Sequence, residues 1–195
     1  MTEPKTKTKH HHGNLRTALI AAGIDLLEEG GVDALTLRKC AARAGVSHAA
    51  PAHHFDGIDG LRVAIAEEGF RRFRRRMLDF ADTGDQSPRR RLHGICKGYL
   101  AFAREDPALY DVIFSFRANS QQIAQVQENS APAYQVLRDT CAPLVPPGTD
   151  PIVIETQVWS LVHGYALLGM TGRFGGGPPP DGEVLALLNS IGTDP

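Results

Sequence analysis

Three observations predict an all-α fold for this chain of 195 residues. Apolar residues recur at helical spacing along most of the chain, with residues that favour helix ends between them. No segment of useful length alternates apolar and polar residues as a half-buried strand does. A capping side chain followed by proline, which is the arrangement preferred at a helix start, occurs three times, at Ser87-Pro88, Asp106-Pro107 and Asp150-Pro151.

The first two predicted helices have clear ends. Asn14 is a suitable N-cap for the first helix, and the pair Gly30-Gly31 ends it. Thr36 can cap a second helix, which Gly45 ends.

A third short helix and a long fourth one follow. Ser47 can cap the third, which extends to Phe55, and residues 59–81 form the fourth. The polar face of the long helix carries an arginine cluster, which is more typical of a solvated helix face than of a second nucleic-acid site. Its members are Arg71, Arg72, Arg74, Arg75 and Arg76.

The C-terminal part predicts further helices. Pro132 is expected to kink or divide a helix over 120–142. Residues 152–170 are strongly apolar, so we expect this helix to be buried on most sides. A Gly/Pro-rich linker over 175–180 then leads to a last helix over 181–191.

Composition excludes several classes of protein. With 42% hydrophobic and 22% charged residues, the chain is globular rather than disordered. Its formal net charge of -1 excludes a uniformly basic coat protein for nucleic acid. Residues 1–78 nevertheless hold 13 Lys and Arg against 9 Asp and Glu, and the remainder holds 8 against 13. This uneven distribution suggests different roles for the two parts.

The cysteines and the apolar runs indicate a compartment. Cys40, Cys96 and Cys141 are odd in number and far apart, so they form neither a disulfide framework nor a zinc-finger pattern. No apolar run is long enough for a membrane span, and no signal peptide precedes the first helix. We therefore expect a reduced, soluble protein of the cytoplasm.

Residues 35–61 have the pattern of a helix-turn-helix. Gly45 supplies the left-handed backbone that the turn between two short helices needs. The second of these helices presents small and hydrogen-bonding side chains, which can approach base edges in a major groove. The turn alone is equally compatible with an ordinary helical hairpin.

The stretch from Thr36 to Phe55, with its Ala-Gly-Val-Ser turn, resembles the DNA-binding signature of TetR-family transcriptional repressors. The residues over 11–16 and 47–51 are similar to one subgroup of that family. This subgroup has a C-terminal ligand-binding domain named WHG for its Trp-His-Gly residues. The residues that resemble this second domain are Trp159, His163, Gly164 and the stretch 106–110.

The resemblance implies two domains and a function. A helix-turn-helix DNA-binding domain with a basic arm would occupy residues 1–60, and a helical effector-binding and dimerisation domain would occupy residues 61–195. A homodimer would bind a palindromic DNA operator and release it on binding a small-molecule effector, because two-fold protein symmetry matches a two-fold site. The last two helices would form the dimer interface. No cofactor and no enzyme activity are implied.

The expected DNA contacts lie on the second and third helices: Thr36, Arg38, Lys39, Ser47, His48, Ala49, Ala52, His53 and His54. The basic arm adds Lys5, Lys7 and Lys9, which either follow phosphates or form a solvated tail, with neither alternative favoured.

The sequence departs from the family at two phosphate-contacting positions. Ala52 replaces a tyrosine and Ile58 replaces a lysine, so two anchors to the DNA backbone are missing from each subunit. Pro51, where a leucine is usual, is expected to cost at most one helical hydrogen bond. DNA binding is therefore expected to be weaker or differently anchored.

The expected effector-binding residues are Tyr99, Phe102, Tyr110, Phe114, Trp159 and His163, since an apolar cavity with a few polar tips is the usual form of a ligand site. Core packing is the alternative for all of them. For Trp159 and His163, which share one helix face, the core interpretation is favoured.

Two other classes of function remain. One is a helical, small-molecule-binding dimer whose helix-turn-helix is weakened or contacts a protein. The other is an enzyme, which is the weakest, because no nucleophile elbow or phosphate loop is present. His48, His53 and His54 lack the spacing of a helical metal pair, so no metal site is expected.

Overall fold

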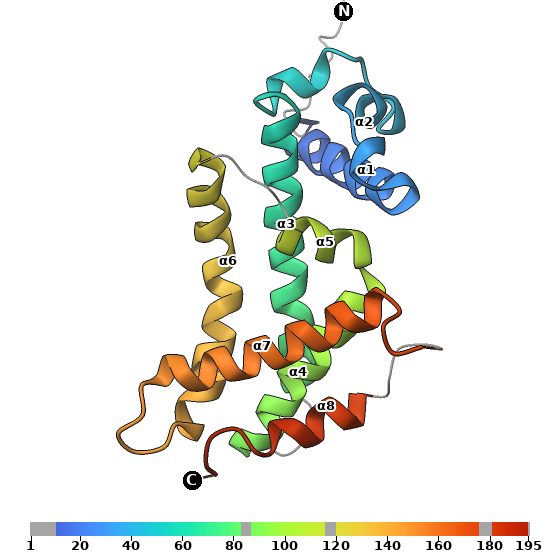
Figure 1. Ribbon diagram of the computed structural model, residues 1–195. Helices are drawn as coiled ribbons and strands as arrows, with labels where there is room; N and C mark the ends of the chain where they lie inside the picture. Colours follow the sequence, from blue (N-terminus) through green and yellow to red (C-terminus); the bar gives the residue numbers. More distant parts are fainter. Residues whose placement is uncertain (1–10, 83–86, 116–119, 176–180, 195) are drawn as a thin grey trace, which may run out of the picture. The chain divides into compact units, whose positions relative to one another are not determined.

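The computed structural model describes residues 11–82, 87–115, 120–175 and 181–194, with side chains except at 11–14 and 115–125. Within these residues the chain is helical, as predicted, and contains no strand (Figure 1). The elements are α1 (His11–Ala34), α2 (Leu37–Arg43), the 3₁₀ helix η1 (Ala50–His53), α3 (Gly57–Ala81), α4 (Pro88–Glu105), α5 (Pro107–Ser115), α6 (Ser120–Cys141), the 3₁₀ helix η2 (Ala142–Leu144), α7 (Pro151–Met170) and α8 (Asp181–Leu188).

The chain forms two compact units, Met1–Ala66 and Glu67–Pro195. The first contains α1, α2, η1 and the beginning of α3, and the second contains the remainder of α3 and α4 to α8. The predicted arm with its lysines, and residues 176–180 of the predicted linker, lie outside the described residues.

The first helix starts earlier than predicted. α1 begins at His11, so Asn14 lies inside it and is not its N-cap. Its regular part ends at Gly30-Gly31, as predicted, because Gly31 has a φ of 65°, which favours glycine.

The caps of α2 were predicted correctly. The Thr36 hydroxyl oxygen accepts a hydrogen bond from the backbone N–H of Lys39 at 3.2 Å. Gly45, which follows the helix, has a φ of 69° and lets the chain turn.

The prediction of a third helix from Ser47 to Phe55 was wrong in type and in length. Only the 3₁₀ helix η1 is present, and its N-cap is Ala49, without a side-chain cap. In an α-helix the N–H of residue 51 would donate to the carbonyl of Ser47, but Pro51 has no N–H. The N–H of Ala50 bonds to that carbonyl instead, at 3.0 Å, which is the three-residue spacing of a 3₁₀ turn.

The core of the first unit comes from α1, α2, the first part of α3 and Phe55, which lies between η1 and α3. Its most buried side chains are apolar and include Leu19, Ile24, Leu27, Cys40, Ala41, Phe55, Leu61 and Ile65. Cys40 and Ala41 form the inner face of α2, so its outer face stays free for polar residues.

In the second unit, α4 contacts α5, α6, α7 and α8. Two glycines let α4 approach the backbone of α3: a Cβ on Gly98 would stand 2.6 Å from Cα of Met77 and still closer to the carbonyl of Arg76. A Cβ on Gly94 would lie 2.8 Å from Cα of Ala81. The two helices therefore meet here without side chains between them.

α6 continues through Pro132 as one helix, so of the two effects predicted for this proline, a kink or a division, the division is excluded.

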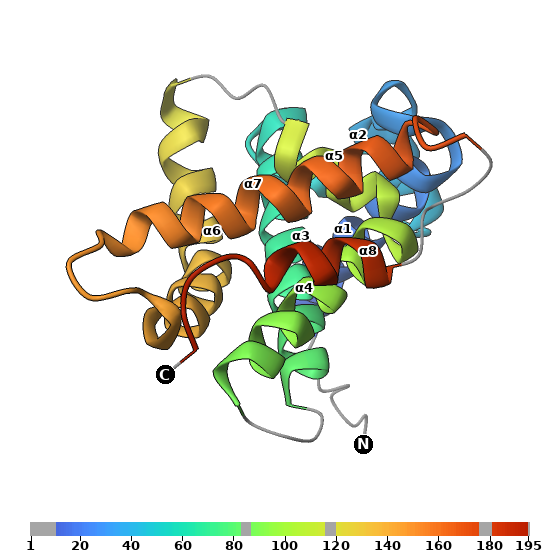
Figure 2. The same ribbon diagram turned by 60° about the horizontal axis from the view of Figure 1, so that its bottom comes forward.

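α7 differs from the prediction. α7 is not buried on most sides, because one of its faces is apolar and open. Figure 2 shows α7 and α8 side by side, and both helices carry exposed apolar residues. These are Ile152, Val153, Trp159, Leu167, Leu168, Met170 and, on α8, Leu187. Mean apolarity along a helix does not tell which of its faces the same chain covers.

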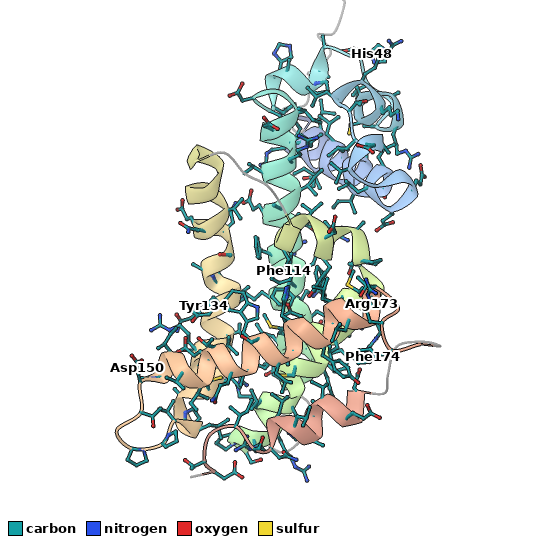
Figure 3. All side chains as sticks on the ribbon, viewed as in Figure 1. His48, Phe114, Tyr134, Asp150, Arg173 and Phe174 are labelled. Carbon is teal, nitrogen blue, oxygen red and sulfur yellow. The ribbon has the colours of Figure 1, made fainter. Side chains whose placement is uncertain are left out.

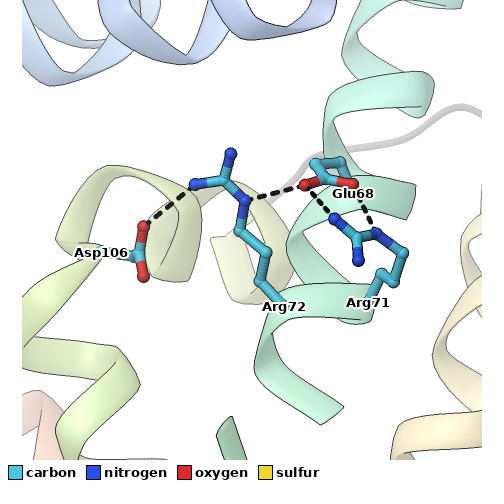
Figure 4. A network of polar contacts seen from close by, with 4 residues as sticks. All are labelled: Glu68, Arg71, Arg72 and Asp106. Carbon is cyan, nitrogen blue, oxygen red and sulfur yellow. Dashed lines mark hydrogen bonds and ion pairs between the residues drawn. The ribbon is translucent and has the colours of Figure 1, made fainter. Parts of the chain in front are cut away.

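The arginine cluster of α3 is largely engaged with carboxylates (Figure 4). Arg71 and Arg72 both donate to Glu68, and Arg72 also reaches Asp106 at 3.4 Å. Burial alone would raise the pKa of Glu68, but the two guanidinium hydrogen bonds outweigh it and lower the pKa. These pairs support the interpretation of a solvated helix face.

Candidate DNA-binding surface and ligand cavity

The predicted DNA-binding residues lie on one side of α2 and in the turn around η1. Eight of the nine are exposed: Thr36, Arg38, Lys39, Ser47, His48, Ala49, Ala52 and His53. His54 is half-buried. Figure 3 shows the His48 side chain pointing away from the core of its unit.

Two cations of this surface are available for an anion. Among the described residues, neither Arg38 nor Lys39 has an ion-pair partner. Arg43, in contrast, forms a bidentate salt bridge with Glu29, with both N–O distances at 2.6 Å. The hydrogen bonds from Arg43 lower the pKa of Glu29. α2 thus presents free charge near its beginning and neutralised charge at its end.

Pro51, Ala52 and Ile58, where the sequence departs from the pattern that it resembles, all lie in the first unit. Ala52 is exposed in η1, Ile58 is half-buried at the start of α3, and Pro51 is buried against the first unit. The methyl group of Ala52 offers no hydrogen-bond donor to a phosphate.

The second unit contains a half-open cavity of about 480 Å³, a volume typical of small-molecule sites. Five helices supply its wall, and most of the side chains are apolar. The lining consists of Phe70, Phe73 and Met77 on α3; Ile95, Cys96 and Tyr99 on α4; Ile113 and Phe114 on α5; Val126, Gln127, Ser130, Ala131, Ala133, Tyr134 and Leu137 on α6; and Val158, Trp159 and Val162 on α7.

One wall of the cavity belongs to an aromatic cluster around His163. The hydroxyl of Tyr99 lies 2.7 Å from Nδ1 of His163, and that of Tyr110 lies 2.9 Å from the same nitrogen. The two hydroxyls are 3.3 Å apart. Phe73 and Phe114 pack edge-on against Tyr99 and His163 respectively. Burial raises the pKa of Tyr99 and lowers that of His163, which favours the neutral form of both groups.

A buried carboxylate lies behind the opposite wall. The hydroxyl of Tyr134 donates to Oε2 of Glu155 at 2.5 Å, and Nε of Arg138 lies 3.8 Å from Oε1. Glu155 is only 5% exposed. Burial, followed by the hydrogen bond to Glu155 and its charge, raises the pKa of Tyr134 to about 12. Tyr134 also packs against Trp159, with ring centroids 5.6 Å apart (Figure 3 labels Tyr134).

The predicted effector-binding residues divide into two groups. Tyr99, Phe114 and Trp159 line the cavity, whereas Phe102, Tyr110 and His163 are not in its wall. Trp159 is 43% exposed, so its interpretation as core was wrong. His163 is half-buried and bonded to two tyrosines, which agrees with its interpretation as a packing histidine.

Sequence reasoning missed most of the cavity wall. Phe73, Met77 and Ile95 stand at helical spacing, and such spacing does not distinguish a core from a cavity lining. Two residues, one in the wall and one behind it, could have been found from the sequence. Tyr134 is a lone aromatic in a polar helix, and Glu155 is the one carboxylate between residues 152 and 170.

A family model described as the tetracyclin repressor-like C-terminal domain matches residues 92–189, just over half of the chain. A second model, described as bacterial regulatory proteins of the tetR family, matches residues 19–72. The chain belongs to the TetR family. The helix-turn-helix of this TetR-family protein lies within the matched region 19–72, and most of the cavity lining lies within the matched region 92–189, with Phe73 and Met77 between the two.

Solved structures agree on the fold. A protein of unknown function from Rhodococcus sp. RHA1 is similar with a TM-score of 0.81 and 28% identity, covering 96% of this chain and 100% of that chain. The transcriptional regulator FadR from Bacillus subtilis, in complex with stearoyl-CoA, has a TM-score of 0.75 and 16% identity, covering 89% and 97%. FadR from Bacillus halodurans, a regulator of fatty acid degradation, has a TM-score of 0.73 and 13% identity, covering 89% and 97%. No curated protein matches the chain.

TetR-family proteins are transcription regulators rather than enzymes. Within the described part of the chain, no helix is both long and apolar enough to cross a membrane. The same residues include no group of three or more potential metal ligands.

Proposed function

We propose that this protein is a ligand-responsive transcriptional repressor, which binds a palindromic operator as a homodimer and leaves it when a small molecule binds. The cavity of about 480 Å³ carries this proposal, because a TetR-family chain needs no such space to bind DNA alone. The Trp159, His163 and Gly164 motif supports membership of the WHG subgroup. A regulator of this kind acts in the cytoplasm, where bacterial DNA is.

The open apolar face of α7 and α8 supports the homodimer. Large apolar side chains gathered on one face are costly in water and mark an interaction surface. Light scattering is expected to give a dimer at micromolar concentration. A Leu167→Glu variant should shift it toward the monomer, and a monomeric wild type would contradict the operator model.

Helix α3 supports a route from ligand to DNA. It contributes Leu61 and Ile65 to the core of the first unit, and Phe70 and Phe73 to the cavity. A ligand that favours one position of α3 would change the spacing of the two helix-turn-helix elements in a dimer. We propose residues 1–60 as the DNA-binding domain and 61–195 as the effector-binding and dimerisation domain.

The DNA contacts are tested by substitution. His53→Ala is expected to cost about 1–3 kcal/mol on the operator if His53 binds a base, and little on a scrambled duplex. Ala52→Tyr and Ile58→Lys should strengthen binding to both duplexes equally, because phosphates carry no base identity. Only the lysine should steepen the fall of log affinity with log salt concentration, by about one unit of slope, because it adds one charged phosphate contact. Fluorescence anisotropy at several salt concentrations, on DNA selected from the genome, measures all of these effects.

The short η1 favours one alternative. A four-residue 3₁₀ helix presents fewer side chains to a groove than the predicted helix, so a small-molecule-binding dimer whose helix-turn-helix contacts a protein is the second candidate. If no selected DNA is bound, and neither Ala52→Tyr nor Ile58→Lys creates binding, this candidate replaces the repressor.

A further inference from the structure

The charges around the cavity restrict what can occupy it. Among the lining residues that the structure describes, none is Lys, Arg or His. A buried carboxylate, phosphate or sulfate on a ligand would find no cation among these residues, and an unpaired buried charge is costly.

The hydroxyl groups of the lining are already engaged. Tyr99 bonds to His163 and Tyr110, Tyr134 donates to Glu155, and Ser130 donates to the carbonyl of Gln127. The hydroxyl hydrogens are thus committed within the protein, and the neutral N–H groups of Gln127 and Trp159 are the other side-chain N–H or O–H donors among the described lining residues. The acceptor lone pairs of Ser130 and Tyr134 suit a ligand hydroxyl better than a ligand carboxylate.

Glu155 adds a fixed negative charge close to the wall. Its side chain is buried behind Tyr134, and the nearest cation, Arg138, lies 3.8 Å away with a side chain that is 56% exposed. A ligand anion would be repelled by this carboxylate. The same charge would attract a ligand cation, but Glu155 is not in the lining and Tyr134 already occupies its Oε2, so no direct ion pair would offset the cost of burying the cation.

We propose that the cavity binds an uncharged apolar molecule, such as an alkyl or ring system with at most a hydroxyl or carbonyl group, and discriminates against anionic amphiphiles. This inference rests on the cavity being the ligand site of the proposed function. It separates this protein from the structurally similar FadR of Bacillus subtilis, which was solved with stearoyl-CoA.

Three probes of equal chain length test the proposal without DNA: decan-1-ol, decanoate and decylamine. Trp159 is the one tryptophan of the chain and lines the cavity, so its fluorescence reports occupancy directly. At about pH 8.5 the alcohol is expected to bind at least about tenfold more tightly than decanoate, since an uncompensated charge is costly to bury. Decanoate affinity should then rise about tenfold for each unit of pH lowered toward about 7, because only the protonated acid enters. The affinity of the alcohol should stay constant.

A charge variant with a matched control sharpens the test. Glu155→Gln keeps an acceptor for Tyr134 and removes the charge, so it should raise decanoate affinity relative to the alcohol. Asp139→Asn removes an exposed carboxylate of α6 that is outside the lining, and it should leave the ratio unchanged. Thermal melting of each variant checks that it is folded.

Other outcomes overturn the inference. The inference is wrong if the alcohol and decanoate bind with equal affinity, or if decylamine binds more tightly than the alcohol. It is also wrong if none of the three probes binds. Stearoyl-CoA binding more tightly than the alcohol would also overturn it. If the expected selectivity is found but no probe releases DNA, the selectivity stands and the release step of the proposed function is wrong.

Discussion

The first unit takes its nine predicted DNA-binding positions from one continuous stretch, 36–54, whereas the cavity of the second unit draws on five helices between Phe70 and Val162. In the first unit a cap and a glycine turn, at Thr36 and Gly45, determine how α2 begins and ends. In the second, the site exists only where helices distant in sequence pack. Local interactions therefore position the predicted DNA surface, and tertiary packing creates the cavity.

The largest effect is expected where α3 and α4 meet. Gly98→Ala places a methyl group against the backbone of Arg76 and Met77, which cannot move away as a flexible side chain could. The free energy of unfolding should fall by about 3 kcal/mol or more. Gly164→Ala is the control, because a methyl group there would meet no neighbouring helix within 4 Å, and it should stabilise α7 by about 0.5–1 kcal/mol. Chemical denaturation measures both. Equal effects would contradict the close approach of α3 and α4.

The Tyr134–Glu155 pair should have the next largest effect. Tyr134→Phe leaves a buried carboxylate without its hydrogen-bond donor and should cost about 1–3 kcal/mol of unfolding free energy. The double variant with Glu155→Met should recover part of this loss, because no unsatisfied charge remains. If the double variant is as unstable as the single one, the hydrogen bond is not what stabilises this part of the cavity wall.

His163 should make stability depend on acid pH. Burial lowers its pKa from 6.5 in the folded protein, so the unfolded chain binds more protons than the folded one as the pH falls below that value. The contribution of His163 is complete above about pH 6.5 and is lost as the pH drops through the lowered folded pKa. Denaturation midpoints from about pH 7.5 down to about pH 5 should therefore fall, and less steeply in His163→Gln. A part of the slope remains in that variant, because His93 has a pKa lowered by burial as well.

The smallest effect is expected in the first unit. Thr36→Ala removes the N-cap of α2 and should cost about 1 kcal/mol, with Thr36→Ser nearly neutral because it keeps the hydroxyl. Hydrogen exchange should report the loss at the first amides of α2 and not in α4 or α7. Exchange that increases equally in both units would contradict the local character of this part of the fold.

The sequence predicted most helices because caps and prolines act over three or four residues. Asp150-Pro151 illustrates this, since the Asp150 carboxylate accepts the N–H of Ile152 at 3.0 Å where α7 begins. The failures have equally physical causes. Pro51 turned a predicted helix into a 3₁₀ turn, and the exposure of Trp159 depends on what the rest of the fold leaves uncovered. Trp159 was predicted from a resemblance, and Tyr99 and Phe114 from their apolar and amphipathic character. The helical pattern by itself distinguishes none of the three from core residues.

The glycine contact between α3 and α4 also governs how the second unit can move. Helices that contact each other through side chains can shear past one another by small rotamer changes. Where two backbones are in direct contact, no side chain is present to adjust in this way. α3 and α4 should therefore behave as a single rigid body. The adjustable part of the cavity is then the wall formed by α6 and α7. The hydrogen bond from Tyr134 to Glu155 joins these two helices. A bound molecule would open that wall first and carry α3 along only together with α4.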